Sequence, residues 1–446
     1  MAFSEKPEIK ELIESRNWAS LRERMSQWRV QDIADLLTDL DKPDRVLLFR
    51  SLPRAVATDV FSEFETPDQE NLLTELTDEE TRHLMAGLAP DDRTDLLEEL
   101  PGQVTQRMLN LLPPEDMKEA RRLLGYPEDS VGRLMTPDYV AVRPEWTVRA
   151  AMEQVRKMGR DTETVNVVYV TDSSWKLIGA VSLRHLVLAR PEDSVSSIMA
   201  TPPVDLPAFA DREEATRTME RYSLLVLPVV DSSGILVGIV TGDDVFELAS
   251  EEATEDFHKG AGVNPLRISF GDASIGLLYK SRIGWLMTLI FVDLIAAGVI
   301  SRFEDAISKV VALVFFLPLL IGCAGNAGAQ SATLVIRDLA TGDVEYKDWL
   351  TLILKEAGIA LMLGLTISLA VWGPSVLQGG APVGVVVALS GAIIVTISSI
   401  IGIATPMLVG KLGLDPAASA SPIITSIADI LGVIIYFTIA SWYLKL

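Results

Sequence analysis

Large apolar residues recur every twelve positions through the first 125 residues of the chain. Within each unit they occupy positions i, i+1 and i+4, which share one face of a helix, as Leu36, Leu37 and Leu40 do. A proline or a capping residue follows each unit, and a single long helix cannot accommodate so many prolines. The pattern predicts a stack of roughly two-turn helices wound into a superhelix, an all-α domain over residues 1–130.

The spacing of the apolar residues changes after this region. Val165–Thr171 and Leu224–Val230 are short β-rich runs, and each is followed by a polar turn and a second run, Leu177–Ser182 or Ile235–Thr241. The two halves align with one another, and each opens on a similar motif, Met-Thr-Pro or Met-Ala-Thr-Pro. The sequence therefore predicts an internally duplicated α/β module over residues 131–256.

The last part of the chain contains five apolar runs, each long enough to cross a hydrocarbon core of ~30 Å. They are Ile283–Ile300, Val310–Ile336, Leu350–Trp372, Val383–Val409 and Ile423–Leu444. We expect an α-helical membrane domain of five spans over residues 283–446, preceded by a connecting helix over residues 257–282. The N-terminus lacks an apolar core behind a basic flank and so does not resemble a signal peptide. We therefore expect the N-terminal half in the cytoplasm and the C-terminus outside, and the distribution of loop Lys and Arg agrees.

Charge separates the same regions. The net charge of −22 divides into −13 over residues 1–130, −8 over residues 131–265 and −1 over residues 266–446. Such an acidic field repels nucleic acid and attracts cations or basic partners, although a merely solvated acidic surface would have the same composition. The single cysteine, Cys323, excludes an intramolecular disulfide, and the three scattered histidines have no zinc-binding spacing.

A dense run of acids follows the second α/β repeat. If this run is helical, Asp244, Glu247, Glu251 and Glu255 lie on one stripe, where like charges repel one another. A hard cation held through its water shell would neutralise them. A solvated, weakened helix is the alternative.

Carboxylates inside the apolar runs are candidate functional groups, because charge is costly in hydrocarbon. Asp429 lies in the fifth run without a basic neighbour in sequence, so we expect it to face a wet path or a cation. Asp293 lies near the middle of the first run, and Glu356 begins the third, where it could pair with Lys355 or sit at the interface. The second run ends in small residues that allow close helix packing. There Asn326 and Gln330 place amide oxygens on one face; no residue is singled out as catalytic.

The duplicated module resembles a tandem of CBS domains, a Bateman module. The resemblance lies in the twin pattern of an apolar strand, a turn opening with Asp172 or Asp231, and a second strand. In that family a Thr/Ser-x-x-Asp motif can hold the ribose of an adenine nucleotide. The second copy keeps Thr241 and Asp244, whereas the first has His185 in place of the acid. The resemblance therefore implies at most one nucleotide site, with a pair used only for dimerisation and switching as the alternative.

Over essentially its full length the chain resembles the MgtE family of magnesium channels. The order of domains matches, and so do a Gly-Asn326-x-Gly-x-Gln330 signature, Leu-Lys-Glu356, and Asp415-Pro-Ala followed by Asp429. The resemblance implies that two protomers form one pore, in which Asp429 receives a hydrated Mg²⁺ near Asn326 and Gln330. It also implies that cytoplasmic acids bind Mg²⁺ to close the gate. By this correspondence the sensor candidates are Asp59, Asp91, Asp95, Asp244, Glu247, Glu252, Glu255 and Asp256.

Two positions depart from the family pattern, and both bear on ion selectivity and pore geometry. Ala329 stands where the signature has a second asparagine, and Ser421 stands where an asparagine precedes a proline.

We predict a homodimeric, multi-pass protein of the cell membrane that takes up Mg²⁺ and is closed by intracellular Mg²⁺, with ATP as a further ligand and no nucleic-acid partner. When Mg²⁺ is scarce the acidic domains repel one another, and bridging ions draw them together when it is abundant. Two alternatives stay open. One is a carrier for Mn²⁺, Co²⁺ or Ni²⁺, including a proton-coupled form that uses Asp293 and Asp429; the other is a non-conducting membrane sensor. An enzyme is not expected, since no nucleophile–base pair or phosphate loop is present.

Overall fold

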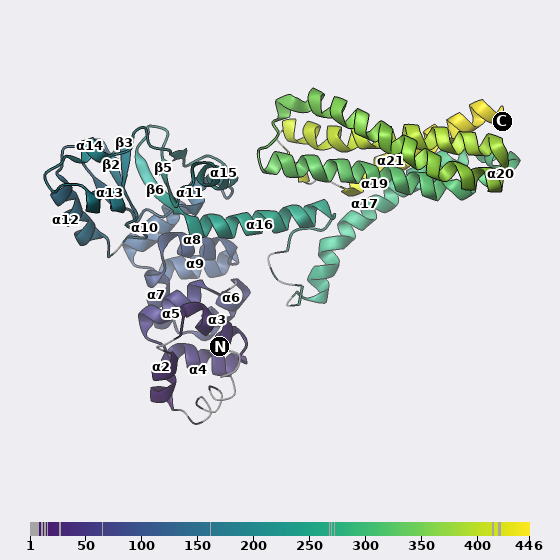
Figure 1. Ribbon diagram of the computed structural model, residues 1–446. Helices are drawn as coiled ribbons and strands as arrows, with labels where there is room; N and C mark the ends of the chain where they lie inside the picture. Colours follow the sequence, from purple (N-terminus) through teal and green to yellow (C-terminus); the bar gives the residue numbers. More distant parts are fainter. Residues whose placement is uncertain are drawn as a thin grey trace. The chain divides into compact units, whose positions relative to one another are not determined.

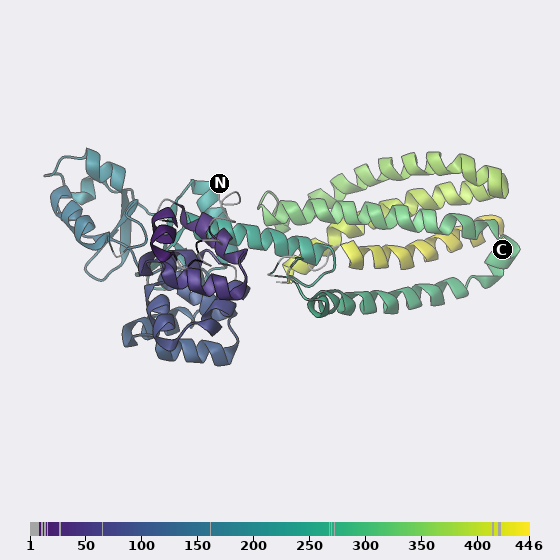
Figure 2. The same cartoon turned by 90° about the horizontal axis from the view of Figure 1, so that it is seen from below.

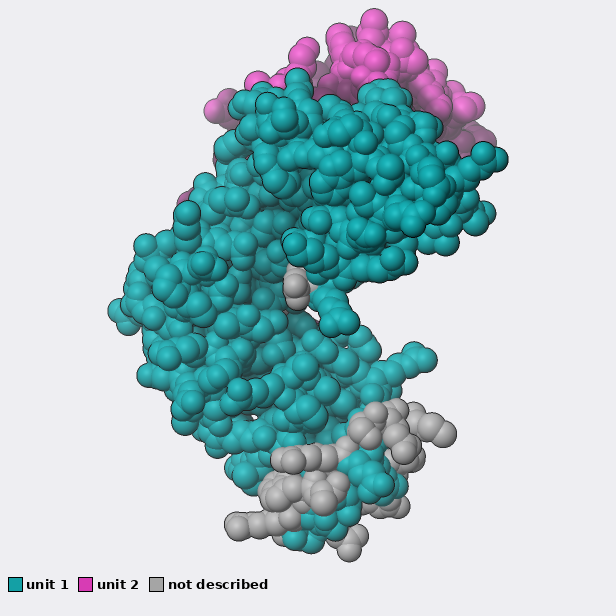
Figure 3. All heavy atoms as spheres, turned by 90° about the vertical axis from the view of Figure 1, so that its left-hand side faces the viewer, with its two compact units in different colours: residues 1–249 teal, residues 250–446 magenta. Residues whose placement is uncertain are grey.

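The fold is described from a computed structural model (Figures 1 and 2). It describes residues 9, 12, 15, 17–25, 28–64, 66–160, 162–266, 268, 270, 271, 273–412, 414–417 and 421–446. Most of the N-terminal segment that was compared with a signal peptide lies outside these residues. The chain divides into two compact units, residues 1–249 and residues 250–446, which are coloured separately in Figure 3.

The first part of the chain is the predicted stack of short helices (Figure 1). Every member of one twelve-residue series is buried, because the series marks the face that each helix presents to its neighbours. The buried series is Leu36, Leu48, Val60, Leu72, Leu84, Leu96 and Met108. The helices are α2 (Trp18–Met25), α3 (Val30–Thr38), α4 (Lys42–Ser51), α5 (Arg54–Ser62), α6 (Thr66–Glu75), α7 (Asp78–Gly87), α8 (Pro90–Glu99), α9 (Gly102–Leu111) and α10 (Pro114–Leu123).

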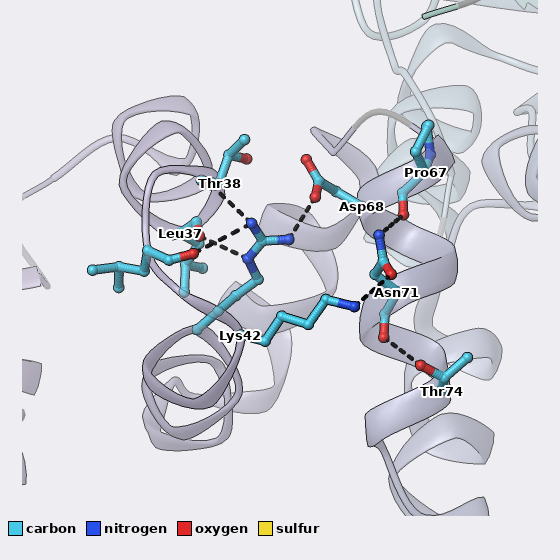
Figure 4. Close-up of polar contacts among 9 residues, drawn as sticks. Leu37, Thr38, Lys42, Pro67, Asp68, Asn71 and Thr74 are labelled. Atoms are coloured by element: carbon cyan, nitrogen blue, oxygen red, sulfur yellow. Dashed lines mark hydrogen bonds and ion pairs between the residues drawn. The ribbon is translucent and has the colours of Figure 1, made fainter. Parts of the chain in front are cut away.

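Polar contacts join helices that are neighbours in the stack. Figure 4 shows the Lys42 ammonium donating to the Asn71 side-chain oxygen at 3.1 Å, which links α4 to α6. Arg45, also on α4, donates to the Leu37 carbonyl at 2.9 Å and forms an ion pair with Asp68 of α6 at 2.5 Å. One guanidinium therefore satisfies a carbonyl at the end of α3 and a carboxylate in the first turn of α6.

The duplicated module consists of two three-stranded sheets of identical topology. In each sheet the first strand is parallel to the second, and the second is antiparallel to the third. Both hairpins carry a register shift at the same place, so the sequence duplication extends to local geometry. The strands are β1 (Ala141–Val142), β2 (Val167–Thr171), β3 (Leu177–Ser182), β4 (Leu206–Pro207), β5 (Val226–Val230) and β6 (Leu236–Thr241). The helices are α11 (Val131–Leu134), α12 (Val148–Met158), α13 (Leu183–Leu188), α14 (Val195–Ile198) and α15 (Arg212–Tyr222).

The acidic run after β6 is helical, which its sequence left conditional. It forms α16 (Gly242–Gly260), which begins in the first unit and ends in the second. The polar Thr241-Gly-Asp-Asp segment leads into this helix. Val245 and Leu248 are its buried apolar residues. The expected connecting helix over residues 257–282 is not continuous, because this helix ends at Gly260 and the next begins at Ile275.

The second unit contains the predicted apolar helices, joined by short α18 (Glu304–Lys309) and η1 (Tyr346–Asp348). Four helices in the described residues are long and apolar enough to cross a membrane. These helices are α17 (Ile275–Ser301), α19 (Ala312–Ala340), α20 (Trp349–Lys411) and α21 (Ser421–Leu444).

Helix α20 contains two of the five predicted spans. Its backbone leaves the helical conformation at Gly380, where φ is +79°. The Ser368 hydroxyl donates to the Ala388 carbonyl at 2.6 Å, although twenty residues of straight helix would separate these groups by ~30 Å. The two halves of α20 therefore fold back on one another, as Figure 2 shows, and a positive φ at the turn suits glycine.

Small residues bring α19 and the second half of α20 into close contact. A Cβ atom at Gly402 would lie only 2.2 Å from the Gly328 carbonyl oxygen, so the two backbones touch. The Ser398 hydroxyl donates to the Ala324 carbonyl at 2.6 Å beside this contact. The glycine-rich end of the second run thus packs closely, as the sequence predicted.

We predict that Gly402→Ala destabilises the membrane bundle by about 1–3 kcal/mol, because the added methyl group meets backbone that cannot move aside. The thermal midpoint of the purified full chain in detergent measures the effect. Gly358→Ala is the matched control, since a Cβ atom at Gly358 has nothing within 4 Å. Equal midpoints for the two variants would contradict the close packing of these backbones.

Candidate cation sites

The acids Asp91 and Asp92 open helix α8. Pro90 occupies the first position of this helix, so the two carboxylates fall in its first turn, where the helix dipole favours negative charge. Asp91 is only 8% exposed, and its Oδ1 atom has no hydrogen-bond partner in the described part of the chain. A buried carboxylate oxygen without a donor is costly, which makes Asp91 a candidate ligand for a cation.

The first turn of α16 supplies the facing acids. Asp244 accepts hydrogen bonds from the Thr241 hydroxyl at 2.6 Å and the Thr241 backbone N–H at 3.4 Å. Burial raises the pKa of Asp244, and the bonds from Thr241 partly offset that effect. The carboxylate is therefore held in a fixed orientation at the start of the helix.

The electrostatic coupling of these groups shows that α8 and α16 bring their acids together. Burial raises the pKa of Asp91 well above its usual range, and repulsion by Asp244 adds to the increase. Desolvation, followed by the charge of Asp244, raises the pKa of Asp92 to about 6. Glu247 and Asp243 contribute further repulsion to Asp92. Two predicted residues, Asp91 and Asp244, thus belong to one cluster.

Glu163 is a member of this cluster that sequence reasoning missed. Desolvation, followed by repulsion from Asp244 and Asp92, raises its pKa to about 7. It lies in the segment between α12 and β2, with its backbone N–H donating to the Asp138 carbonyl at 3.0 Å. No helical periodicity marks such a residue, so only the folded chain identifies it.

The remaining predicted sensor residues lie elsewhere in the first unit or further along α16. Asp59 is exposed on α5 and lines a hollow of about 720 Å³ between short helices. Asp95 is exposed on α8, one helical turn beyond Asp91. Glu252 and Asp256 lie near the end of α16, where burial, followed by repulsion from Asp415 and Glu252, raises the pKa of Asp256.

Glu255 is already paired with an internal cation. The Lys259 ammonium, one turn further along α16, forms ion pairs with Glu255 and with Asp415, the latter at 2.6 Å. Part of the acidic stripe predicted on this helix is therefore neutralised by the chain itself.

The candidate pore residues lie on α19 and α21. Gly325 lies against Thr425, and Gly432 against Ile321, so these helices run antiparallel. Asp429, between Thr425 and Gly432, therefore lies at roughly the depth of the Asn326 turn. The Asn326 and Gln330 side chains are exposed on one face of α19, while Asp429 is half-buried. An exposed amide face within hydrocarbon requires water or a second protein surface.

Two further carboxylates lie in the spans. Asp293 is exposed on α17, which packs against α21. Glu356 is 8% exposed and accepts a hydrogen bond from the Ser331 hydroxyl at 2.6 Å. The sequence left Glu356 either paired with Lys355 or at the membrane interface; in the fold, the packing of α19 on α20 places its carboxylate beside Ser331.

Thr241 and Asp244 also form the candidate ribose site. The Thr241 hydroxyl donates to the Asp244 carboxylate at 2.6 Å, so the two side chains of the motif lie side by side. In the first repeat the equivalent pair is Ser182 and His185, whose Oγ and Nδ1 atoms lie 2.9 Å apart. Only the second repeat offers a carboxylate for ribose hydroxyls.

Carboxylates and amide groups in these positions suit Mg²⁺, which retains several waters and is bound through one or two carboxylates. Among the described residues, no three His, Cys, Asp or Glu side chains form a group that could hold a metal ion directly.

An apolar helical bundle with a half-buried carboxylate, Asp429, joined to an acidic N-terminal unit, is typical of a cation transporter of the membrane. The chain is 40% identical over 327 residues to magnesium transporter MgtE of Thermus thermophilus, with 73% of each chain covered. It is 38% identical over 328 residues to magnesium transporter MgtE of Bacillus subtilis, with 73% of this chain and 72% of the relative covered. The chain belongs to the MgtE family, a family of transporters and not of enzymes.

Family descriptions and solved structures agree with this assignment. Residues 317–439 match the family described as a divalent cation transporter, and residues 28–129 match the MgtE intracellular N domain. Residues 131–192 and 195–251 each match the CBS domain. The cytosolic domain of the Mg²⁺ channel MgtE in complex with ATP is 35% identical, with a TM-score of 0.53, and covers 56% of this chain and 100% of its own. The soluble part of a magnesium transporter is 27% identical, with a TM-score of 0.53; the match covers 57% of this chain and 100% of that structure. The predicted family and fold class are confirmed.

We predict that without divalent cations the thermal stability of the full chain falls as pH rises from about 4 to about 7. The pKa values of Asp92 (about 6) and Glu163 (about 7) exceed their ordinary values of 3.8 and 4.5. The folded state therefore binds more protons than the unfolded state in this window, and it loses stability as those protons leave. Thermal midpoints in EDTA between pH 4 and pH 8 measure the slope.

The matched variant for this test is Asp92→Asn combined with Glu163→Gln. Neutral amides cannot titrate, so the decline should be shallower in this variant, and Mg²⁺ should restore less stability to it at pH 8. A slope identical to that of the wild type would contradict the predicted coupling.

Proposed function

We propose that this chain is a Mg²⁺ channel or transporter for uptake, closed by Mg²⁺ that binds its acidic domains from inside the cell. The half-buried Asp429, with no basic partner among the described residues, carries most of this proposal. A carboxylate in a span is retained where it faces water, a partner or a passing ion. Two relatives, both named magnesium transporters, support Mg²⁺ as the ion.

The pore is proposed to form between two copies of the chain. Asn326 and Gln330 are exposed on α19 of a single chain, and a facing copy would enclose their amide groups together with Asp429. Mg²⁺ sheds its water reluctantly, so amide and carboxylate oxygens around a hydrated ion suffice for binding. Ala329 and Ser421 are the positions at which selectivity would differ from that of relatives.

Orientation in the membrane follows from the loop charges. Lys280 and Arg282 lie in the first turns of α17, Arg337 lies in the last turn of α19, and Lys347 lies in η1 before α20. The positive-inside rule places these ends in the cytoplasm, together with the N-terminal half. We propose four functional segments: residues 1–130 and 131–256 as the sensing part, 257–282 as the connection, and 283–446 as the pore.

Sensing is proposed to depend first on the cluster of Asp91, Asp92, Glu163, Asp244 and Glu247. Desolvated carboxylates repel one another unless a cation lies among them, so Mg²⁺ stabilises the arrangement that holds α8 beside α16. Asp59, Asp95, Glu252 and Asp256 are proposed as outlying ligands. ATP is proposed to bind the second CBS repeat through Thr241 and Asp244, which would link nucleotide and cation through one carboxylate. The ATP-bound relative supports this assignment.

One specific observation favours the alternative of a proton-coupled carrier. Asp293, exposed on α17, gives the membrane domain a second carboxylate near α21. Uptake that depends on an imposed pH gradient would favour the carrier over the channel.

We predict that Asp429→Asn lowers Mg²⁺ flux at least about tenfold, because the variant loses the charge that attracts the ion. Flux is measured with a Mg²⁺-sensitive dye inside liposomes that contain the purified full chain. Asp305→Asn, in α18 between the first two spans, is the matched control and should conduct normally. Undiminished flux through Asp429→Asn would contradict the proposed pore, and no flux through the wild type would reject the transport function.

We predict that Asp91→Asn combined with Asp92→Asn conducts at internal Mg²⁺ concentrations that close the wild type. Removing two charges lowers the repulsion that Mg²⁺ relieves, so ion binding no longer distinguishes the closed arrangement. The measurement is the internal Mg²⁺ concentration that halves the flux, and we expect it to rise about fivefold or more. A control that neutralises the exposed acids Asp35 and Asp41 should keep the wild-type midpoint. Suppression at the wild-type concentration in both variants would contradict the sensor.

A further inference from the structure

The fourth residue of each short helix from α4 to α9 occupies the same place in the twelve-residue repeat. These residues are Arg45, Ala57, Gln69, Thr81, Arg93 and Thr105. Four of them donate a hydrogen bond to the carbonyl oxygen eight residues earlier, in the last turn of the preceding helix. The bonds run from Arg45 to Leu37 at 2.9 Å, from Gln69 to Phe61 at 3.0 Å, from Arg93 to Met85 at 3.4 Å and from Thr105 to Leu97 at 3.2 Å. In these four repeats a side chain therefore caps the end of the helix before it.

The other two positions lack this bond, for different reasons. Thr81 carries a short donor, and its hydroxyl is buried without a hydrogen-bond partner in the described part of the chain. Ala57 has no donor at all. Within the described residues, the carbonyl eight positions before it, that of Phe49, accepts only the Leu52 N–H at 3.1 Å. Pro53, four residues after Phe49, has no N–H to add, so the end of α4 keeps a free acceptor.

The hollow that Asp59 lines lies at this uncapped helix end. Its volume is about 720 Å³, within the range of small-molecule pockets, and both Phe49 and Ala57 line it. Ala55 and Gly87 line it as well, so short side chains help to keep the space open. The one repeat that carries alanine at the capping position thus also contains a hollow large enough for a ligand.

A carboxylate accompanies the arginine in the repeats that use one. Arg45 pairs with Asp68 at 2.5 Å (Figure 4), and Arg93 pairs with Glu119 at 2.9 Å. Asp68 is the third residue of α6, and twelve positions later Glu80, the third residue of α7, lines the hollow. The repeat with alanine therefore keeps both kinds of partner that Arg45 has, a helix-end carbonyl and a carboxylate.

The hollow has charges of both signs. Arg50 pairs with Glu80 at 2.9 Å, and its hydrogen bond is the main reason why the pKa of Glu80 is lowered, so this carboxylate is charged. The other ionisable residues that line the hollow are Arg54, Asp59, Glu79 and His83. The Phe49 carbonyl lies at the negative end of the α4 dipole, which favours a cationic donor there.

We propose that the hollow between α5 and α7 binds a small guanidinium compound, which takes the place that arginine has in other repeats. Its guanidinium group donates to the Phe49 carbonyl, as the Arg45 guanidinium does to the Leu37 carbonyl. The ionisable residues of both signs suit a ligand that also carries the charged groups of an amino acid. The proposal rests on the helical stack alone and is independent of the proposed transport function.

The first test is the binding of L-arginine to the purified full chain in EDTA, measured by isothermal titration. L-Citrulline is the matched probe, because it has the same length but ends in an uncharged ureido group. We expect citrulline to bind at least about tenfold more weakly, since charge-assisted hydrogen bonds are stronger than neutral ones. No binding of arginine, or equal affinities for the two compounds, would overturn the proposal.

The second test restores the residue that other repeats carry. Ala57→Arg should abolish the binding of free arginine and raise the thermal midpoint by about 2 °C or more, because its own guanidinium reaches the Phe49 carbonyl. Ala57→Met fills the same space without a donor, so it should abolish binding without raising the midpoint. Ala86→Arg, at an exposed position of α7, is the matched control and should keep the wild-type affinity and midpoint.

The variants locate the site, whereas the titration of the wild type stands whether or not they fold. Wild-type affinity for arginine in Ala57→Arg would place the ligand elsewhere and overturn the assignment to this hollow. A midpoint for Ala57→Arg no higher than that of Ala57→Met would show that a donor at this position does not cap α4, which would equally overturn it.

Discussion

Both units of this protein contain carboxylates that are partly removed from water. In the soluble part, Asp91 and Asp244 come from helices far apart in sequence, and burial followed by the charge of Asp244 raises the pKa of Asp91. In the membrane part, Asp429 lies in a span without a basic partner among the described residues. Neither arrangement is favourable alone, so a cation bound beside either one would stabilise it.

Lys259 marks the boundary of that behaviour. Up to Glu247 the acids of α16 face other acids, whereas Glu255 and Asp415 share an ammonium supplied by the chain. One helix thus carries a cluster of acids near its start and an ion pair supplied by the chain near its end.

The sequence predicted those features that depend on local pattern. Leu36 and Leu48 mark a buried face because helical burial follows a short period, and the β2 and β6 strands follow from apolar runs beside polar turns. Glu163 and the Lys259–Asp415 pair could not be predicted, because their neighbours are set by tertiary folding between distant segments. The contact of Glu356 with Ser331 could not be predicted either, because Ser331 lies on another helix. The candidate ligands came from the resemblance to a family. Only the fold shows which of these acids lie in a cluster, such as Asp91 and Asp244, and which lie apart, such as Asp59.

The reversal of α20 at Gly380 has a consequence for biogenesis. A turn this short leaves no polar loop between the two halves, and the Ser368–Ala388 bond is made only when both are side by side. Backbone groups near the turn would be unsatisfied in lipid if one half entered alone. The third and fourth spans should therefore insert together as a helical hairpin, and a long hydrophilic insertion at the turn would convert a concerted step into two separate ones.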